Sequence, residues 1–216
     1  TNGNVTCQGD AHTFTITVFP GLVVTPFNDV EVCEDAAVIL GVNLVQMGVP
    51  PYTYVWTGPN GFMSSAASPV ISPSIWNVHT GAYNIRVTDS NGCSGTATMD
   101  VIVNPTPVFT LQPKDIYVCD GASGTVASAA TVANGSPVSY TLQLQSGQTW
   151  QNIATNATGN FTLNNLNLSM NGNVYRIVAL ADHNPMPDCA RSSVLFSLFV
   201  HDDQGLACND MVNYSI

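Results

Sequence analysis

Charged residues are scarce in this 216-residue chain, and basic residues are the scarcest of all. Only 8% of the residues are Asp, Glu, Lys or Arg, against roughly 25% in ordinary soluble domains. Four scattered residues, Arg86, Lys114, Arg176 and Arg191, carry all the positive charge of Arg and Lys, and the net charge is −10. Because nucleic acids and anionic membranes are bound by clustered positive charge, the sequence argues against both as partners.

Several other signals are missing. No apolar run approaches the roughly 18 residues that a membrane-spanning helix needs, so no membrane span is predicted. The cysteines form no C-x-x-C pair, and there is no G-x-S-x-G, H-E-x-x-H or phosphate-binding glycine motif. The histidines fall in separate segments, and His183 near Cys189 is interpreted as a loop residue beside a bridged cysteine. We therefore predict that the chain is not an enzyme and has no resident cofactor.

Apolar residues make up 45% of the chain, which is enough for packed cores. They alternate with polar residues at 13–19, 83–87, 97–103, 140–144 and 175–179. This period of two is typical of strands with one buried face, and no helical period competes with it. Turn sequences separate these short strands, so the pattern predicts an all-β sandwich or barrel fold. The length suits two sandwiches of about 100 residues each.

The two halves repeat one succession of motifs. Each half has Val-Cys followed by an acidic residue, then a Tyr-containing strand, then a Gly-to-Tyr strand, then a cysteine before an apolar strand. The motifs stand at 32–34, 52–56, 81–83 and 93 in the first half, and at 118–120, 139–142, 172–175 and 189 in the second. The Pro-containing segment 104–107 is the predicted boundary between the halves.

The repeat predicts four regions. Residues 21–104 and 105–201 are two whole modules. Residues 1–20 are interpreted as the last strand of a preceding module or as a donor strand, and residues 202–216 as the start of a following module. The chain begins at Thr1 without a signal peptide, and we interpret it as a mature or excised segment.

Three stretches resemble a known group of proteins: PYTYVWTGPNGF, GAYNIRVTDSNGCSGTATMDVIVNPTP and LNLSMNGNVYRIV. They are similar to the immunoglobulin-like and PKD-like tandem repeats of very large Bacteroidota cell-surface proteins, such as gliding-motility adhesins and other type IX secretion substrates. The resemblance implies tandem immunoglobulin-like β-sandwiches with orphan strands at the two ends. It also implies a secreted, cell-surface location and a spacer or adhesive role.

The resemblance assigns structural roles to four core residues. Trp56 matches the core tryptophan of an immunoglobulin strand C, and Leu142 takes that place in the second module. Tyr83 and Tyr175 match the tyrosine-corner position, where the hydroxyl bonds back to the main chain. Isoleucine stands where the usual core cysteine follows two residues later, so the cysteines are expected to act elsewhere.

The cysteines are widely spaced, which favours disulfides in an oxidising compartment. The repeat pairs Cys33 with Cys93 and Cys119 with Cys189, and leaves Cys7 and Cys208 to neighbouring modules. One difficulty is that the paired positions lie at opposite ends of an immunoglobulin topology, too far apart for a bridge. Bridges between successive modules or between chains are the alternative.

Calcium is a minority hypothesis. Asp89 and Asn91 supply oxygens in a turn that lacks the last glutamate of an EF-hand, and a plain hairpin tip is the simpler interpretation. Asp202 and Asp203 form a second weak candidate pair. Acidic residues at 31–35 cluster near one module end, where a solvated face is the default expectation.

The leading hypothesis is a structural or adhesive segment of a large extracellular repeat protein, forming a stalk or surface filament. Its expected partners are neighbouring modules of the same polypeptide, with self-association through the alternating strand at 11–19. The alternative is a binding module for calcium or for a glycan. Aromatic side chains available to stack on a sugar are Tyr52, Phe62, Trp76 and Trp150.

Overall fold

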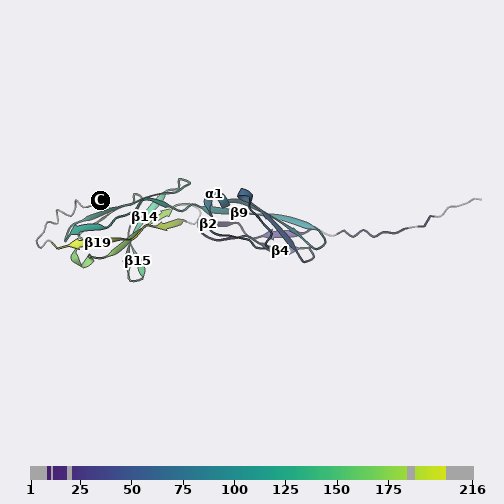
Figure 1. Cartoon of the computed structure of the whole chain (residues 1–216), viewed down its shortest axis with the longest axis horizontal. Coiled ribbons are helices and arrows are strands. Elements are labelled where there is room, and N and C mark those ends of the chain that lie inside the picture. Colours follow the sequence, from purple (N-terminus) through teal and green to yellow (C-terminus); the bar gives the residue numbers. More distant parts are fainter. Residues whose placement is uncertain (1–8, 11, 19–20, 184–187, 203–216) are drawn as a thin grey trace, which may run out of the picture.

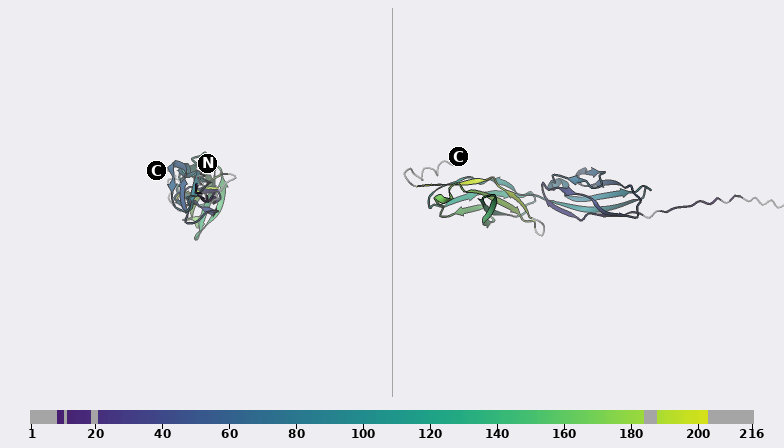
Figure 2. Two further views of the ribbon diagram at one scale, coloured as in Figure 1. Left: turned by 90° about the vertical axis from the view of Figure 1, so that its right-hand side faces the viewer. Right: turned by 90° about the horizontal axis from the view of Figure 1, so that it is seen from below.

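The computed structural model describes residues 9–10, 12–18, 21–183 and 188–202. Within these residues the chain forms strands almost throughout, as the alternating pattern predicts. Figure 1 shows two β-sandwiches placed end to end, and the second view of Figure 2 shows the same arrangement from below. The prediction of an all-β fold is confirmed.

The first sandwich contains one five-stranded sheet and a second layer of two short strand pairs. The five-stranded sheet runs in the order β2 (Val30–Cys33), β9 (Ser94–Asn104), β8 (Gly81–Thr88), β5 (Thr53–Thr57) and β6 (Met63–Ser64). The pairs are β1 (Val23–Pro26) with β4 (Val42–Gln46) and β3 (Val38–Ile39) with β7 (Val70–Ile71). Two short helical turns, η1 (Pro59–Gly61) and α1 (Trp76–His79), connect strands.

The core of the first sandwich forms where the inward faces of the two layers meet. On β8 the side chains of Tyr83, Ile85 and Val87 are buried, while the residues between them face water. Trp56 on β5 has no exposed surface, lies opposite Ile85, and donates from Nε1 to the carbonyl oxygen of Ala66 at 3.1 Å. Period-two burial on paired strands thus produces one continuous apolar cluster.

The second sandwich repeats this plan. Its main sheet runs in the order β11 (Ile116–Cys119), β19 (Phe196–His201), β17 (Val174–Ala181), β14 (Val138–Ser146) and β15 (Thr149–Asn156), with β18 (Cys189–Ser192) also paired to β17. The facing pairs are β10 (Val108–Leu111) with β13 (Ala129–Thr131) and β12 (Gly124–Ala127) with β16 (Asn160–Leu163). The turn η2 (Leu168–Met170) precedes β17.

The second core is a separate cluster built from the same positions. Leu142 on β14 is fully buried and lies opposite Ile177 on β17, in the place that Trp56 and Ile85 occupy in the first sandwich. Tyr175 is also buried, and its ring stacks on Phe196 with centroids 5.7 Å apart. Each sandwich therefore has its own core, as expected for independent domains.

The early strand of each sandwich pairs in parallel with the last strand. β2 runs beside β9 so that Cys33 lies opposite Asn104, and β11 runs beside β19 so that Cys119 lies opposite His201. In each sandwich, the cysteine of the Val-Cys motif therefore lies at the end where the last strand finishes and the chain leaves the sandwich. In the first sandwich, this is the end that faces the second sandwich (Figure 1).

Residues 12–18 precede the first sandwich and belong to no sheet of the described chain. Their alternating side chains are open to solvent, with Phe14, Ile16 and Val18 exposed by 83%, 74% and 83%. Residues 12–18 therefore have the alternating sequence of a strand but do not pair with another strand in the described part of the chain. Residues 1–8, 11, 19–20 and 203–216 lie outside the described residues.

Candidate functional site

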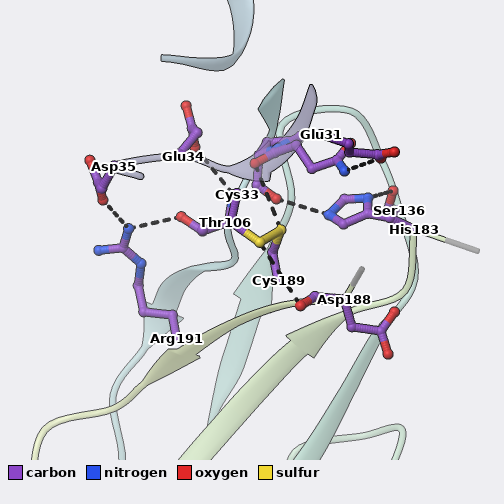
Figure 3. The surroundings of a disulfide bond; sticks show 12 residues. Glu31, Cys33, Glu34, Asp35, Thr106, Ser136, His183, Asp188, Cys189 and Arg191 are labelled. Atoms are coloured by element: carbon purple, nitrogen blue, oxygen red, sulfur yellow. Dashed lines mark hydrogen bonds and ion pairs between the residues drawn. A yellow bond between two sulfur atoms is a disulfide. The ribbon is translucent and has the colours of Figure 1, made fainter. Parts of the chain in front are cut away.

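A disulfide joins the two sandwiches. Cys33 at the end of β2 is bonded to Cys189 at the start of β18, with Cα atoms 5.6 Å apart and a sequence separation of 156 residues. Figure 3 shows the bridge at the junction, surrounded by polar side chains from both sandwiches. The repeat-based pairing of Cys33 with Cys93 and of Cys119 with Cys189 is wrong, and a bridge between successive modules is what the structure contains.

The topology explains this correction. Cys33 lies beside Asn104 at one end of β9, whereas Cys93 lies just before the other end of that strand. The 11 residues of β9 span about 35 Å, far beyond the roughly 7 Å limit for bridged Cα atoms. Cys93 is a free, half-buried thiol, and Cys119 is itself disulfide-bonded. Cys7 and Cys208 lie outside the described residues.

The segment between the sandwiches is buried, although its sequence is that of a linker. Asn104 and Thr106 are exposed by only 8% and 6%, and Pro105 and Pro107 are buried as well. Because two of the four residues are proline, the backbone here has little freedom to lose. The junction is therefore packed against both domains.

Two glutamates of the first sandwich hold this segment. Glu34 accepts hydrogen bonds from the backbone N–H of Trp76 at 3.1 Å and of Thr106 at 3.2 Å. Glu31 accepts one from the Asn104 side chain at 2.6 Å. These carboxylates were expected on a solvated acidic face, but in the structure Glu34 binds the backbone of the connecting segment and Glu31 binds the Asn104 side chain.

The second sandwich contributes Arg191, whose role sequence reasoning missed, and His183, which was predicted as a loop residue beside a bridged cysteine. Arg191 donates to the Thr106 hydroxyl at 2.8 Å and forms an ion pair with Asp35 at 3.3 Å. His183 lies 3.1 Å from the carbonyl oxygen of Pro105 through Nε2 and 3.2 Å from the Ser136 hydroxyl through Nδ1. Since a carbonyl oxygen only accepts, Nε2 carries the proton in the first of these bonds.

Ser136 lies in a loop and Arg191 is an exposed residue of the short strand β18, so no periodic pattern in the sequence pointed to either as a junction residue. The available signal was indirect: a Pro-x-Pro segment between two Val-Cys repeats. Together the disulfide, the buried prolines and the side chains from both sandwiches form one contact surface, which we call the junction. Its described members are Glu31, Cys33, Glu34, Asp35, residues 104–106, Ser136, His183, Cys189 and Arg191.

The calcium candidates serve other contacts or stand apart. Asp89 is buried, and its carboxylate accepts backbone N–H groups from Asn91 and Cys93 at 2.9 Å and from Val49 at 3.1 Å. Burial opposes its ionisation, but these bonds and one from Gly92 outweigh that effect and lower the pKa of Asp89 below 3.8. Its oxygens thus already organise the hairpin.

The remaining members of the calcium hypothesis do not converge on Asp89. Asn91 donates its backbone N–H to that carboxylate, Asp202 is exposed directly after β19, and Asp203 lies outside the described residues. Across the described parts of the chain, no group of three or more His, Cys, Asp or Glu residues is placed to hold a metal ion.

The two tyrosine-corner candidates differ. The hydroxyl of Tyr83 donates to the carbonyl oxygen of His79 at 3.0 Å, four residues earlier at the end of α1. The hydroxyl of Tyr175 makes no hydrogen bond to another described residue. The turn before Tyr175 is the 3-10 turn η2, whereas the turn before Tyr83 is α1. The same Gly-to-Tyr motif therefore gives different tyrosine hydroxyl contacts in the two sandwiches.

The aromatic side chains considered for sugar stacking are engaged within the protein. Trp150 is covered by the guanidinium group of Arg176, 4.2 Å from its ring centroid. Phe62 packs edge-on against Tyr83, Tyr52 donates to the carbonyl oxygen of Gly48, and Trp76 packs on the first core. They do not form one exposed platform.

Comparison with known proteins supports the fold. No known family profile matches the chain. Chitinase A of Pseudoalteromonas piscicida is 38% identical over 100 residues, which are 42% of this chain but only 12% of the chitinase. Among solved structures, the three N-terminal domains of the highly immunogenic outer capsid protein Hoc of bacteriophage RB49 match with a TM-score of 0.53 and 14% identity, over 84% of this chain and 70% of that one.

Two further structural matches are weaker. A three-immunoglobulin-domain fragment of titin has a TM-score of 0.42 at 11% identity, over 83% of this chain and 65% of that one. The first two immunoglobulin domains of DIP-gamma have a TM-score of 0.38 at 16% identity, over 85% of this chain and 99% of that one. The strand order and the Hoc likeness together confirm the predicted tandem immunoglobulin-like β-sandwiches. No helix in the described residues is long and apolar enough to cross a membrane.

Proposed function

We propose that this chain is a non-catalytic structural segment of an extracellular repeat protein, in which immunoglobulin-like modules are locked end to end to form a stalk or filament. The observation that carries the proposal is the Cys33–Cys189 bridge between sandwiches, together with the buried segment that it flanks. Domains that must swing independently are usually joined by exposed, flexible linkers. This junction has the opposite design.

The junction limits motion in more than one direction. The disulfide fixes one point, the Arg191 contacts with Asp35 and Thr106 lie beside it, and the His183 contact with Pro105 adds a third attachment. Contacts from the second sandwich to Cys33, to Asp35 and to the connecting segment oppose rotation of one sandwich about the other. A fixed angle between modules is what a spacer of defined length needs.

The setting follows from composition and resemblance. A disulfide of this kind persists in oxidising compartments, which supports a secreted protein. The resemblance to Bacteroidota surface repeats supports a cell-surface location and type IX secretion. Residues 1–20 are then the last strand of a preceding module, and residues 202–216 are the start of a following one.

Nuclear magnetic resonance relaxation tests this proposal directly. In the oxidised protein both sandwiches should tumble as one elongated body, with rotational correlation times fitted by a single diffusion tensor. The double variant Cys33→Ser/Cys189→Ser should loosen this coupling, while Cys93→Ser, a cysteine away from the junction, should leave it unchanged. If the two sandwiches of the oxidised wild-type protein tumble independently, the proposed role is wrong.

A second candidate is binding to a polysaccharide, which the likeness to a chitinase favours. The matched 100 residues are 12% of that enzyme, so they are compatible with an accessory module of a chitin-degrading protein. The engaged state of Trp150 and Phe62 argues against a stacking platform. A pull-down with insoluble chitin decides: no depletion of the protein from solution refutes this candidate.

A further inference from the structure

Cys93 occupies in the first sandwich the position that Cys189 occupies in the second. The backbone of Cys93 faces Asp89 after β8, through the bond from the Asp89 N–H to the Cys93 carbonyl oxygen, and Cys189 faces Ala181 at the end of β17. Cys93 directly precedes β9, which pairs with β8, and Cys189 is the first residue of β18, which pairs with β17. Yet Cys189 is completely buried in the junction, whereas Cys93 is a half-buried free thiol.

The surface around Cys93 corresponds to the surface that the second sandwich uses at the junction. There, the 132–137 loop and the residues directly after β17 are joined by the contact of Ser136 with His183, and His183 also contacts the carbonyl oxygen of Pro105. In the first sandwich the 47–51 loop and the 89–93 hairpin are joined by the Asp89 carboxylate, which accepts from Val49 and Cys93. Both modules thus present the same two loops, tied together, at the same end.

This end of the first sandwich also exposes apolar side chains. Met47 is 64% exposed and Val49 is 47% exposed, and Val49 adjoins Cys93 through their shared contacts with Asp89. These exposed side chains lie beside Cys93, whose half-buried side chain packs against the first core.

Residues 12–18 identify the partner that fits this surface. Counted from Pro20 and Pro105, Phe14, Ile16 and Val18 align with Met99, Val101 and Val103 of β9. The β9 residues are at most 1% exposed, whereas their counterparts are 74–83% exposed. The strand that follows each proline begins three residues later in both cases, at Val23 and at Val108. Residues 12–18 therefore have the sequence pattern of the last strand of a module, with an apolar face that the core of that module would bury.

The parallel pairing then places a second cysteine. In both modules the Val-Cys strand ends beside the end of the last strand, as Cys33 does beside Asn104 and Cys119 beside His201. A module that ends in residues 12–18 would hold its Val-Cys cysteine next to the connection into the first sandwich. Cys33 holds the same position relative to Cys189 at the observed junction.

We propose that Cys93 forms a disulfide with the Val-Cys cysteine of an immunoglobulin-like module that precedes the first sandwich, in the way that Cys189 is bonded to Cys33. The inference rests on the proposed structural role. The bond forms by thiol–disulfide exchange with a small-molecule disulfide such as oxidised glutathione. The two protein thiols lose two electrons and two protons, and one glutathione disulfide is reduced to two thiols.

A fusion made only of sequence from this chain supplies the probe. Residues 21–105 carrying Cys93→Ser are placed directly before residues 21–216, so that the added Pro105 stands where Pro20 stood. After refolding with reduced and oxidised glutathione, non-reducing peptide mapping should recover a Cys33 peptide joined to the Cys93 peptide. The matched control adds Cys33→Ser to the added copy, and there Cys93 should react fully with iodoacetamide.

The outcomes separate this inference from the proposed function. Full alkylation of Cys93 in the folded, oxidised fusion overturns the inference, and tumbling of the unfused chain as one body at the same time leaves the structural role standing. Independent tumbling of the two sandwiches overturns the structural role whatever Cys93 does. If the fusion does not fold, mapping of the protein purified from its own cells decides, and Cys93 recovered free, or bonded to Cys7, overturns the inference.

Discussion

Removing the Cys33–Cys189 bridge should destabilise both sandwiches, although neither core would be touched. The sulfur of Cys189 lies 3.9 Å from the carbonyl oxygen of Asn104, and Cys33 lies beside Asn104 in the folded first sandwich. When the second sandwich unfolds, the intact bridge therefore closes a loop of about 85 residues, the separation of Asn104 and Cys189. In the chain-entropy description, a loop of this size is worth about 4.5 kcal/mol of stability.

The variant to compare is Cys33→Ser/Cys189→Ser, since a single substitution would leave a thiol able to exchange with Cys93. For a domain of about 100 residues, a loss of about 4.5 kcal/mol lowers Tm by about 20–35 °C. Differential scanning calorimetry measures this shift, with the free-thiol variant Cys93→Ser as a control that should move Tm by only a few degrees. A lowering of less than about 5 °C, equivalent to about 1 kcal/mol, would refute the loop-closure reasoning.

Four further results are expected. Trp56→Ala should cost about 3–5 kcal/mol in urea denaturation, because it empties the centre of the first core, and a loss below 1 kcal/mol would contradict that packing. Arg191→Met should cost less than about 1 kcal/mol by the same assay, because the Asp35 ion pair is largely exposed. The lowered pKa of Asp89 adds stability above about pH 4, and this stability is lost as the pH falls through the pKa of the folded state. Asp89→Asn should therefore reduce the fall in Tm between pH 5 and pH 2. The same fall in Tm in the variant and the wild-type protein would contradict this reasoning. EDTA should leave Tm unchanged at pH 7, and a clear drop would revive structural calcium.

The strands and cores were readable from the sequence because burial leaves a local mark. In 83–87 and 175–179 the apolar residues alternate, and the structure buries those residues. Leu142 could be placed in the position of Trp56 because a repeat shows which residues are equivalent. Such inferences need only neighbouring residues and a common plan.

The junction was not readable in the same way, because equivalence does not show which positions face each other. Cys33 and Cys93 are equivalent to Cys119 and Cys189, but the bridge joins the first member of one pair to the second member of the other. The geometric objection to pairing within a module was sound, since it depends on strand direction and length. Arg191, 156 residues from Asp35, offered no local pattern at all.

The position of the Cys33–Cys189 bridge also determines how the chain responds to a pull along its length. Tension enters the first sandwich before Cys33 and leaves the second after Cys189, so the covalent load passes from one sulfur to the other. The stretch between the two cysteines, which are separated by 156 positions in sequence, lies outside that path. At roughly 3.4 Å per residue, about 500 Å of contour length stays hidden under force until the bridge is reduced. An array built in this way would extend little under force, because each bridge keeps the sequence between its two cysteines from being stretched.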